Sequence, residues 1–136
     1  ARGRNGRGEP WTIAIEKPEA GQRSVERLIR LGDHTVSTSG NYRNFFEQNG
    51  QRYSHVINPR TGWPVPHTLA SVTVIGDRSM VADATATALL AAGPELGFQL
   101  ASEHHLAAFF VLIEPDGGFK ERFTPEFEPY LLPQQP

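Results

Sequence analysis

The sequence predicts an α+β domain in which two helices pack on one face of a mainly antiparallel sheet. The expected elements come in blocks, with strands first, then two helices and then two strands, an order typical of α+β domains. Asn-Gly and Asp-Gly turn signals lie between strand-like runs, which favours antiparallel hairpins. Residues 106–113 are almost wholly apolar, as expected of a central strand that is covered on both faces.

The composition limits both size and partners. A chain of 136 residues is expected to form one domain with a single hydrophobic core. Thirteen Lys and Arg against fifteen Asp and Glu give a net charge of −2, so no general attraction to nucleic acid or anionic membrane is expected. Without cysteine, this segment has no disulfide framework, thiolate zinc site or cysteine nucleophile, which is compatible with an oxidising compartment.

The first part of the chain is expected to hold a loop and three strands. Residues 1–10 alternate Gly and Arg with no apolar anchor, which favours a flexible loop or linker over a basic nucleic-acid arm, and we expect the segment to begin mid-protein. Residues 11–16 alternate as a half-buried strand. Residues 24–31 fit a strand or a short helix, and we favour the strand. Residues 35–40 are β-prone, and their hydroxyls also suit a plain exposed strand edge.

A hairpin centred on Asn49-Gly50 is predicted next, because this turn signal lies between the aromatic-rich runs 42–47 and 52–57. Residues 58–62 then read as a tight turn. His55 therefore stands at a strand end beside a rigid turn, where an imidazole can be held for proton transfer or for a phosphate contact. A packing role for a strand-end histidine remains the alternative. The other histidines, at 34, 67, 104 and 105, fall in polar loops or at a helix end.

A strand at 69–76 is expected to lead into a helix over 79–93. We expect Ser79 to cap its start, Gly93 to end it in a left-handed conformation and Pro94 to prevent its continuation. Asp83 and Thr87, four residues apart, share one face of this helix. Their oxygens suit magnesium, although Asp near a helix start and Thr bonded back to a carbonyl also occur for structural reasons alone.

The rest of the chain is expected to add a second helix and a second hairpin. Residues 94–103 read as the helix, and an Asp-Gly-Gly turn at 116–118 joins the apolar run 106–113 to a strand at 119–123. The domain is therefore expected to span 11–125, followed by a Pro-rich tail at 126–136 that is either docked or loose. Glycine-rich phosphate loops, Gly-x-Ser-x-Gly elbows and His-Glu-x-x-His helices do not occur in the sequence.

Three motifs resemble one enzyme family and occur in that family's order. They are VSTSGNYR at 36–43, RYSHVINPRTGWPV at 52–65 and ADATATA at 82–88. From residue 11 to 113 the chain resembles the ApbE-like FAD:protein FMN transferases. The resemblance implies a T-fold-like α+β unit, the C-terminal half of a tandem protein. It also implies cleavage of FAD with magnesium, attachment of FMN to a Thr or Ser of an acceptor protein, and release of AMP.

The resemblance also implies roles for individual residues. Asp83 and Thr87 match the magnesium ligands, and His55 matches a histidine near the flavin phosphates, a base or a phosphate-positioning group. The flavin site is implied to include His55 and its neighbour Ile57, together with the strand segment Ser37, Thr38, Ser39 and Gly40. Asn58 stands where the family often has Asp, a position where a turn-forming Asn is equally suitable.

The family's upstream half is not part of this sequence. The resemblance therefore implies that the upstream half of the same protein or a second chain, including a homodimer partner, completes the unit. It further implies a periplasmic location or a membrane anchor facing the periplasm, with acceptors among membrane redox complexes. A flavin-binding or assembly module that lacks transferase activity is the alternative function.

Overall fold

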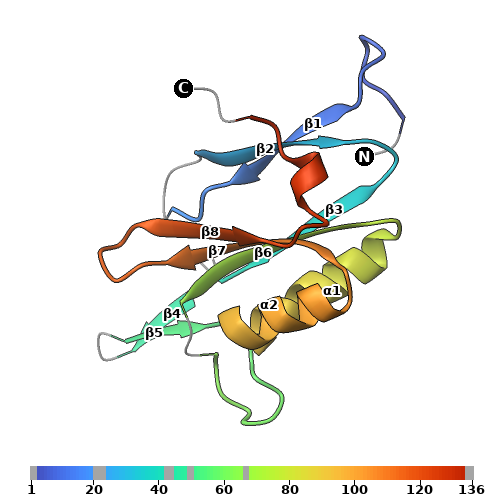
Figure 1. Cartoon of the computed structure of the whole chain (residues 1–136). Helices are drawn as coiled ribbons and strands as arrows, with labels where there is room; N and C mark the ends of the chain where they lie inside the picture. The colour runs from blue at the N-terminus through green and yellow to red at the C-terminus, as the bar shows by residue number, and fades with distance from the viewer. Residues whose placement is uncertain (1–2, 20–23, 42–44, 49–50, 66–67, 134–136) are drawn as a thin grey trace.

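The computed structural model describes residues 3–19, 24–41, 45–48, 51–65 and 68–133. Its elements follow the predicted order of strands, two helices and two strands (Figure 1). They are β1 (Trp11–Glu16), β2 (Val25–Leu31), β3 (Thr35–Gly40), β4 (Phe45–Gln48), β5 (Gln51–Ser54), β6 (Leu69–Gly76), α1 (Ser79–Ala92), α2 (Pro94–Glu103), β7 (Ala107–Ile113), β8 (Phe119–Phe123) and a short 3₁₀ helix, η1 (Glu128–Tyr130).

The centre of the molecule is an antiparallel sheet in the order β3-β6-β7-β8. Helix α1 packs on β3 and β6, and α2 packs on β7, so both helices cover the same face, as predicted. The β1–β2 hairpin covers the opposite face, which the sequence did not indicate (Figure 1). The fold is therefore α+β in three layers: hairpin, sheet and helices.

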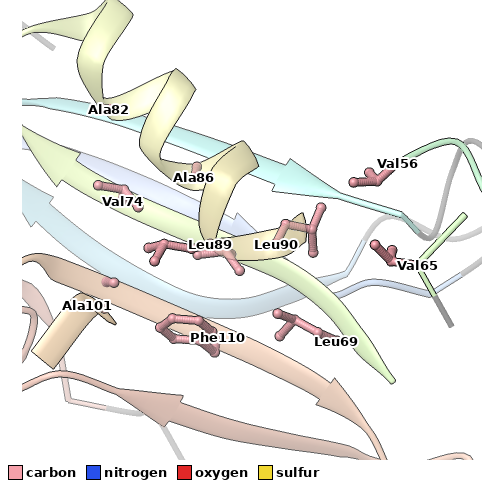
Figure 2. Close-up of a cluster of buried hydrophobic side chains, with 12 residues drawn as sticks. Val56, Val65, Leu69, Val74, Ala82, Ala86, Leu89, Leu90, Ala101 and Phe110 are labelled. Carbon is pink, nitrogen blue, oxygen red and sulfur yellow. The ribbon is translucent and has the colours of Figure 1, made fainter. Parts of the chain in front are cut away.

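Small and branched apolar residues form the core between the sheet and the helices (Figure 2). In α1 the buried residues are Ala82, Ala86, Leu89 and Leu90, which follow the helical period and form one apolar stripe. The alanines let the helix lie close to the sheet, since a Cβ added at Gly76 of β6 would lie 3.9 Å from that of Ala82. This close approach brings the polar face of α1 to the edge strand β3.

Both ends of α1 fall where the sequence predicted them, and only the predicted capping residue at its start differs. Gly93 ends the helix with φ 89°, and α2 starts directly at Pro94. The prediction of Ser79 as the N-cap was wrong: Arg78 holds that place, with no side-chain capping bond, and its carbonyl accepts from Val81 and Ala82 at 3.1 and 3.0 Å. The connection from β6 has only two residues, so the helix must begin by Ser79.

Strand β7 is covered on both faces, as its apolar run predicted. Phe110 points to the helices, while Phe109 and Val111 pack under the hairpin with Ile29 and Phe127. Phe109 and Phe127 have ring centroids 5.4 Å apart. Alternate side chains of β7 thus belong to two separate cores, one on each face of the sheet.

Of the predicted tail at 126–136, the described part up to residue 133 is docked, one of the two outcomes left open by its sequence. Phe127 is fully buried, and Leu131 forms a β-bridge with Ile29 of β2. The amide of Leu132 donates to the Leu28 carbonyl at 2.9 Å. These contacts add the tail to the layer formed by the β1–β2 hairpin.

Charged groups tie that hairpin to β8. Arg27 contacts both carboxylate oxygens of Glu121 at 2.6–2.8 Å, with both side chains largely buried. Burial, together with a hydrogen bond to Glu121 and the charge of that residue, raises the pKa of the neighbouring Glu26 carboxyl. The hairpin is therefore held by apolar packing and by the partly buried ion pair of Arg27 with Glu121.

The predicted hairpin at Asn49-Gly50 is present, with β4 and β5 paired from Phe45↔Ser54 to Gln48↔Gln51. Asn49 and Gly50 themselves lie outside the described residues. Neither helix in the described part of the chain is long and apolar enough to cross a membrane.

Candidate functional site

Two hydrogen bonds join β3 to α1 and bring four predicted site residues together. The Ser37 hydroxyl donates to Asp83 Oδ1 at 2.7 Å, and the Ser39 and Thr87 hydroxyls lie 2.8 Å apart. Ser37 and Ser39 lie about 6.7 Å apart along the strand, and Asp83 and Thr87 lie about 6 Å apart along the helix axis. Because these two spacings are similar, each serine can lie opposite its own partner. We call these four residues the β3–α1 oxygen site.

The oxygen site is accessible from solvent. Asp83 and Thr87 are exposed on α1, and Ser37 and Ser39 are half-buried on β3. Thr87 also donates to the Asp83 carbonyl at 3.1 Å, the backbone bond expected of a helical threonine. The structural role of Thr87 is therefore observed, and the same hydroxyl also borders an open group of oxygens.

The other two residues of the predicted strand segment are placed differently. Thr38 lies between the two serines, so strand alternation turns it to the other face of the sheet. Its hydroxyl lies 2.8 Å from that of Thr73 on β6, and Thr73 is fully buried. Gly40 ends β3 and pairs with Ser71. Neither Thr38 nor Gly40 is joined to α1 by the described hydrogen bonds.

His55 follows β5 and is exposed at the start of the next loop. The Ser54 hydroxyl accepts from the amide of Val56 at 3.0 Å, so the backbone on both sides of His55 is fixed. Ile57, half exposed at 49%, forms a β-bridge with Pro64. The predicted strand-end position of His55 beside a turn is thus confirmed.

The turn after His55 has the predicted form. The Asn58 carbonyl accepts from Thr61 and Gly62 at 3.2 and 2.8 Å, and Gly62 has φ 70°. The Asn58 side chain accepts from the Arg60 amide at 2.9 Å, so this residue serves the turn and no charge is needed there.

Val56 connects this loop to the helix that carries Asp83. It belongs to the core cluster of Ala86 and Leu90 and lies beside Leu90 at the C-terminal end of α1 (Figure 2). His55 and Ile57 flank Val56 in the chain and are exposed. The loop and the oxygen site are therefore anchored in the same core.

The oxygen site has the donors for a hard cation. One carboxylate and three hydroxyls supply only oxygen, which suits magnesium when waters or phosphate oxygens complete its coordination. Among the described residues no group of three or more His, Asp or Glu side chains that could hold a metal ion is found, either at this site or elsewhere. The residues thus fit magnesium bound through few protein ligands and a phosphate substrate, and do not form a closed all-protein cage.

Sequence reasoning missed the direct pairing of Ser37 with Asp83 and of Ser39 with Thr87. The signal in the sequence was that two serines two residues apart on a strand have nearly the same spacing as Asp83 and Thr87, four residues apart on a helix. It also missed the exposure of Trp63, 70% accessible in the loop after His55. His67 lies outside the described residues.

Curated proteins and solved structures similar to this chain agree with one another. An FAD:protein FMN transferase of Vibrio cholerae is 45% identical over 130 residues, which cover 96% of this chain and 39% of the relative. The structure of Pseudomonas stutzeri flavinyl transferase ApbE, in its apo form, has a TM-score of 0.79 at 45% identity, with 96% of this chain and 39% of that one covered. The flavin transferase ApbE from Vibrio cholerae has a TM-score of 0.81 at 43% identity, with 95% and 40% covered.

This chain thus spans about two fifths of the length of these relatives. A sequence model described as the ApbE family matches residues 1–110, most of the chain. The motifs, the α+β fold and these similarities lead to one conclusion: the chain belongs to the ApbE family.

Proposed function

We propose that this chain is the C-terminal segment of a magnesium-dependent FAD:protein FMN transferase. The observation that carries the proposal is the β3–α1 oxygen site, an exposed group of hard oxygen donors in a chain of the ApbE family. The names of the relatives, which are FAD:protein FMN transferases, support FAD as the substrate.

In this proposal Asp83 and Thr87 hold the magnesium ion. Bound there, the ion would neutralise negative charge on the pyrophosphate of FAD. Asp83 supplies the single protein carboxylate, and the exposure of both residues leaves room for phosphate oxygens.

His55 is the proposed base or phosphate-positioning residue. The hydroxyl of an acceptor Thr or Ser attacks the phosphorus on the FMN side of the pyrophosphate, its proton passes to the imidazole, and the bond to AMP breaks with AMP leaving. The fixed backbone on both sides of His55 supports this role, because a base must be held within hydrogen-bond reach of the proton. Ile57 is the proposed apolar neighbour of the flavin in this loop.

The partners proposed are FAD, an acceptor protein of a membrane redox complex, and the remaining part of the same protein or a second copy. The covered share of the relatives supports the need for more chain than is present here. A periplasmic or periplasm-facing location is proposed with them, and the absence of cysteine is compatible with it.

The test follows the mass of an acceptor peptide, with a Thr after Gly-Ala, incubated with FAD, magnesium and the protein at natural length. Addition of the FMN mass is expected with the wild type and is expected to be lost in Asp83→Asn. Asn still accepts the Ser37 bond, so folding should be preserved.

Asp116→Asn is the matched control. Asp116 lies in the turn beside β8, at the other edge of the sheet from β3, and its Oδ1 accepts from the Gly118 amide at 2.8 Å, a bond that Asn also provides. This variant should transfer FMN normally. If the folded wild type transfers no FMN but binds FAD, the transferase proposal is wrong and a flavin-binding module is the better assignment.

A further inference from the structure

The direction of the hydrogen bonds in the β3–α1 oxygen site depends on where the Thr87 hydroxyl proton lies. With the single Thr87 proton placed on the Asp83 carbonyl, the contact that a helical threonine usually makes, Ser39 is the donor in the 2.8 Å contact with Thr87. Ser37 donates its proton to Asp83 Oδ1. In this arrangement all three hydroxyl protons are used inside the group.

This direction determines which ligands the site accepts. Once the protons are used, Asp83 Oδ2 and the remaining lone pairs of the hydroxyls are acceptors, and no hydroxyl donor is left for a ligand. A phosphate or a flavin carbonyl needs a donor, whereas a cation needs acceptors. The arrangement suits a cation and disfavours a direct contact from the serine hydroxyls to FAD.

We propose that Ser37 and Ser39 are positioning residues for the magnesium ligands, and that they act through Asp83 and Thr87 and not by contacting the flavin. This inference rests on the proposed function. The resemblance to the family assigns both serines to the flavin site, and the geometry points to a different role. Ser37 fixes the orientation of the carboxylate, and Ser39 turns the lone pair of Thr87 outward.

The Ser37 and Ser39 hydrogen bonds restrain different proposed magnesium ligands, Asp83 and Thr87, so the two bonds can be tested separately. Without Ser37 the exposed Asp83 carboxylate is free to adopt other rotamers, and without Ser39 the Thr87 hydroxyl loses the bond that orients its lone pair. Removal of an outer partner of a metal ligand typically lowers metal affinity about 10–100-fold. The binding of FAD itself should change only through the metal.

The experiment uses the protein at natural length and the variants Ser37→Ala and Ser39→Ala. The magnesium dependence of the melting temperature is measured with magnesium alone and with magnesium plus FAD. The FAD dissociation constant at saturating magnesium and the magnesium midpoint of FMN transfer are measured alongside. Both variants should shift the magnesium midpoints upward about 10–100-fold while the FAD constant at saturating magnesium stays unchanged.

Two further variants keep the result interpretable. Ser102→Ala removes a hydroxyl bond of similar length, 2.9 Å to the Phe98 carbonyl in α2, and should leave every magnesium midpoint unchanged. Ser37→Thr retains the hydroxyl and should recover most of the magnesium affinity.

The outcomes separate the inference from the proposed function. A raised FAD dissociation constant at saturating magnesium, with unchanged magnesium midpoints, would assign the serines to the flavin and overturn the inference. Unchanged values for both quantities would overturn it as well. If the wild type showed neither magnesium-dependent stabilisation nor FMN transfer, the proposed function itself would fail.

Discussion

Gly97 offers a quantitative test of how closely α1 and α2 pack. A Cβ built at this position would lie 2.6 Å from the Leu89 carbonyl oxygen and 3.5 Å from Cε1 of Phe110. The obstacle is backbone of the helix that carries Asp83, and unlike a side chain it cannot rotate away. Gly97→Ala must therefore push the two helices apart or bend one of them.

The expected loss of stability is the difference between two effects. Overpacking a core position typically costs about 1–3 kcal/mol, and a backbone obstacle favours the upper end of that range. Replacing Gly by Ala inside a helix offsets about 1 kcal/mol through helix propensity. The net destabilisation expected for Gly97→Ala is therefore about 2 kcal/mol.

Guanidinium unfolding followed by circular dichroism measures this change, with Gly32→Ala as the control. A Cβ at Gly32 meets no atom within 4 Å, so the control should stay within about 0.5 kcal/mol of wild type. A Gly97→Ala protein about 1 kcal/mol more stable than wild type would refute the close helix packing, because only the propensity gain would then remain.

Three further predictions concern other parts of the fold. Burial and Glu121 raise the pKa of Glu26, so the folded state holds this proton more tightly and the free energy of unfolding falls as pH rises above the ordinary carboxyl value. Glu26→Gln should therefore stabilise the protein at pH 7 by up to about 1 kcal/mol and have no effect near pH 3. Unfolding measured across pH tests this. Phe127→Ala should cost about 3–5 kcal/mol in the same assay at pH 7, since the ring is fully buried, and a change below 1 kcal/mol would mean that the tail is not docked. Trp63→Ala should shift the melting temperature little because its side chain is 70% exposed, and a large loss would show that the ring packs in the fold.

Local sequence patterns predicted the helices and strands, but they did not predict contacts between residues that are far apart in the sequence. The strand at 69–76 and the helix at 79–93 with its Gly93 and Pro94 stop were predicted, because period and stop signals are properties of neighbouring residues. The hairpin on the reverse face depends on contacts such as that of Arg27 with Glu121, 94 positions apart. The burial of Phe127 depends on the same tertiary packing, and no local pattern in the proline-rich tail predicts it.

The candidate site shows the same limit. The one-turn spacing of Asp83 and Thr87 is visible in the sequence, and so is the strand-end position of His55. The partner of Thr87 is Ser39, 48 positions earlier, and such a pairing is decided only when the helix packs on the sheet. Ser37, Thr38 and Ser39 look equivalent as a run of hydroxyls, and strand alternation separates them in space.

The alanine face of α1 constrains how this site can change during evolution. Ala82 and Ala86 hold the helix against the sheet, while Asp83 and Thr87 on the same helix contact β3 at hydrogen-bond distance. A larger side chain at either alanine would lift the helix and lengthen both contacts together. Changes of core volume in α1 are therefore expected to need compensating changes in β3 or β6, even at buried positions that lie away from the oxygen site.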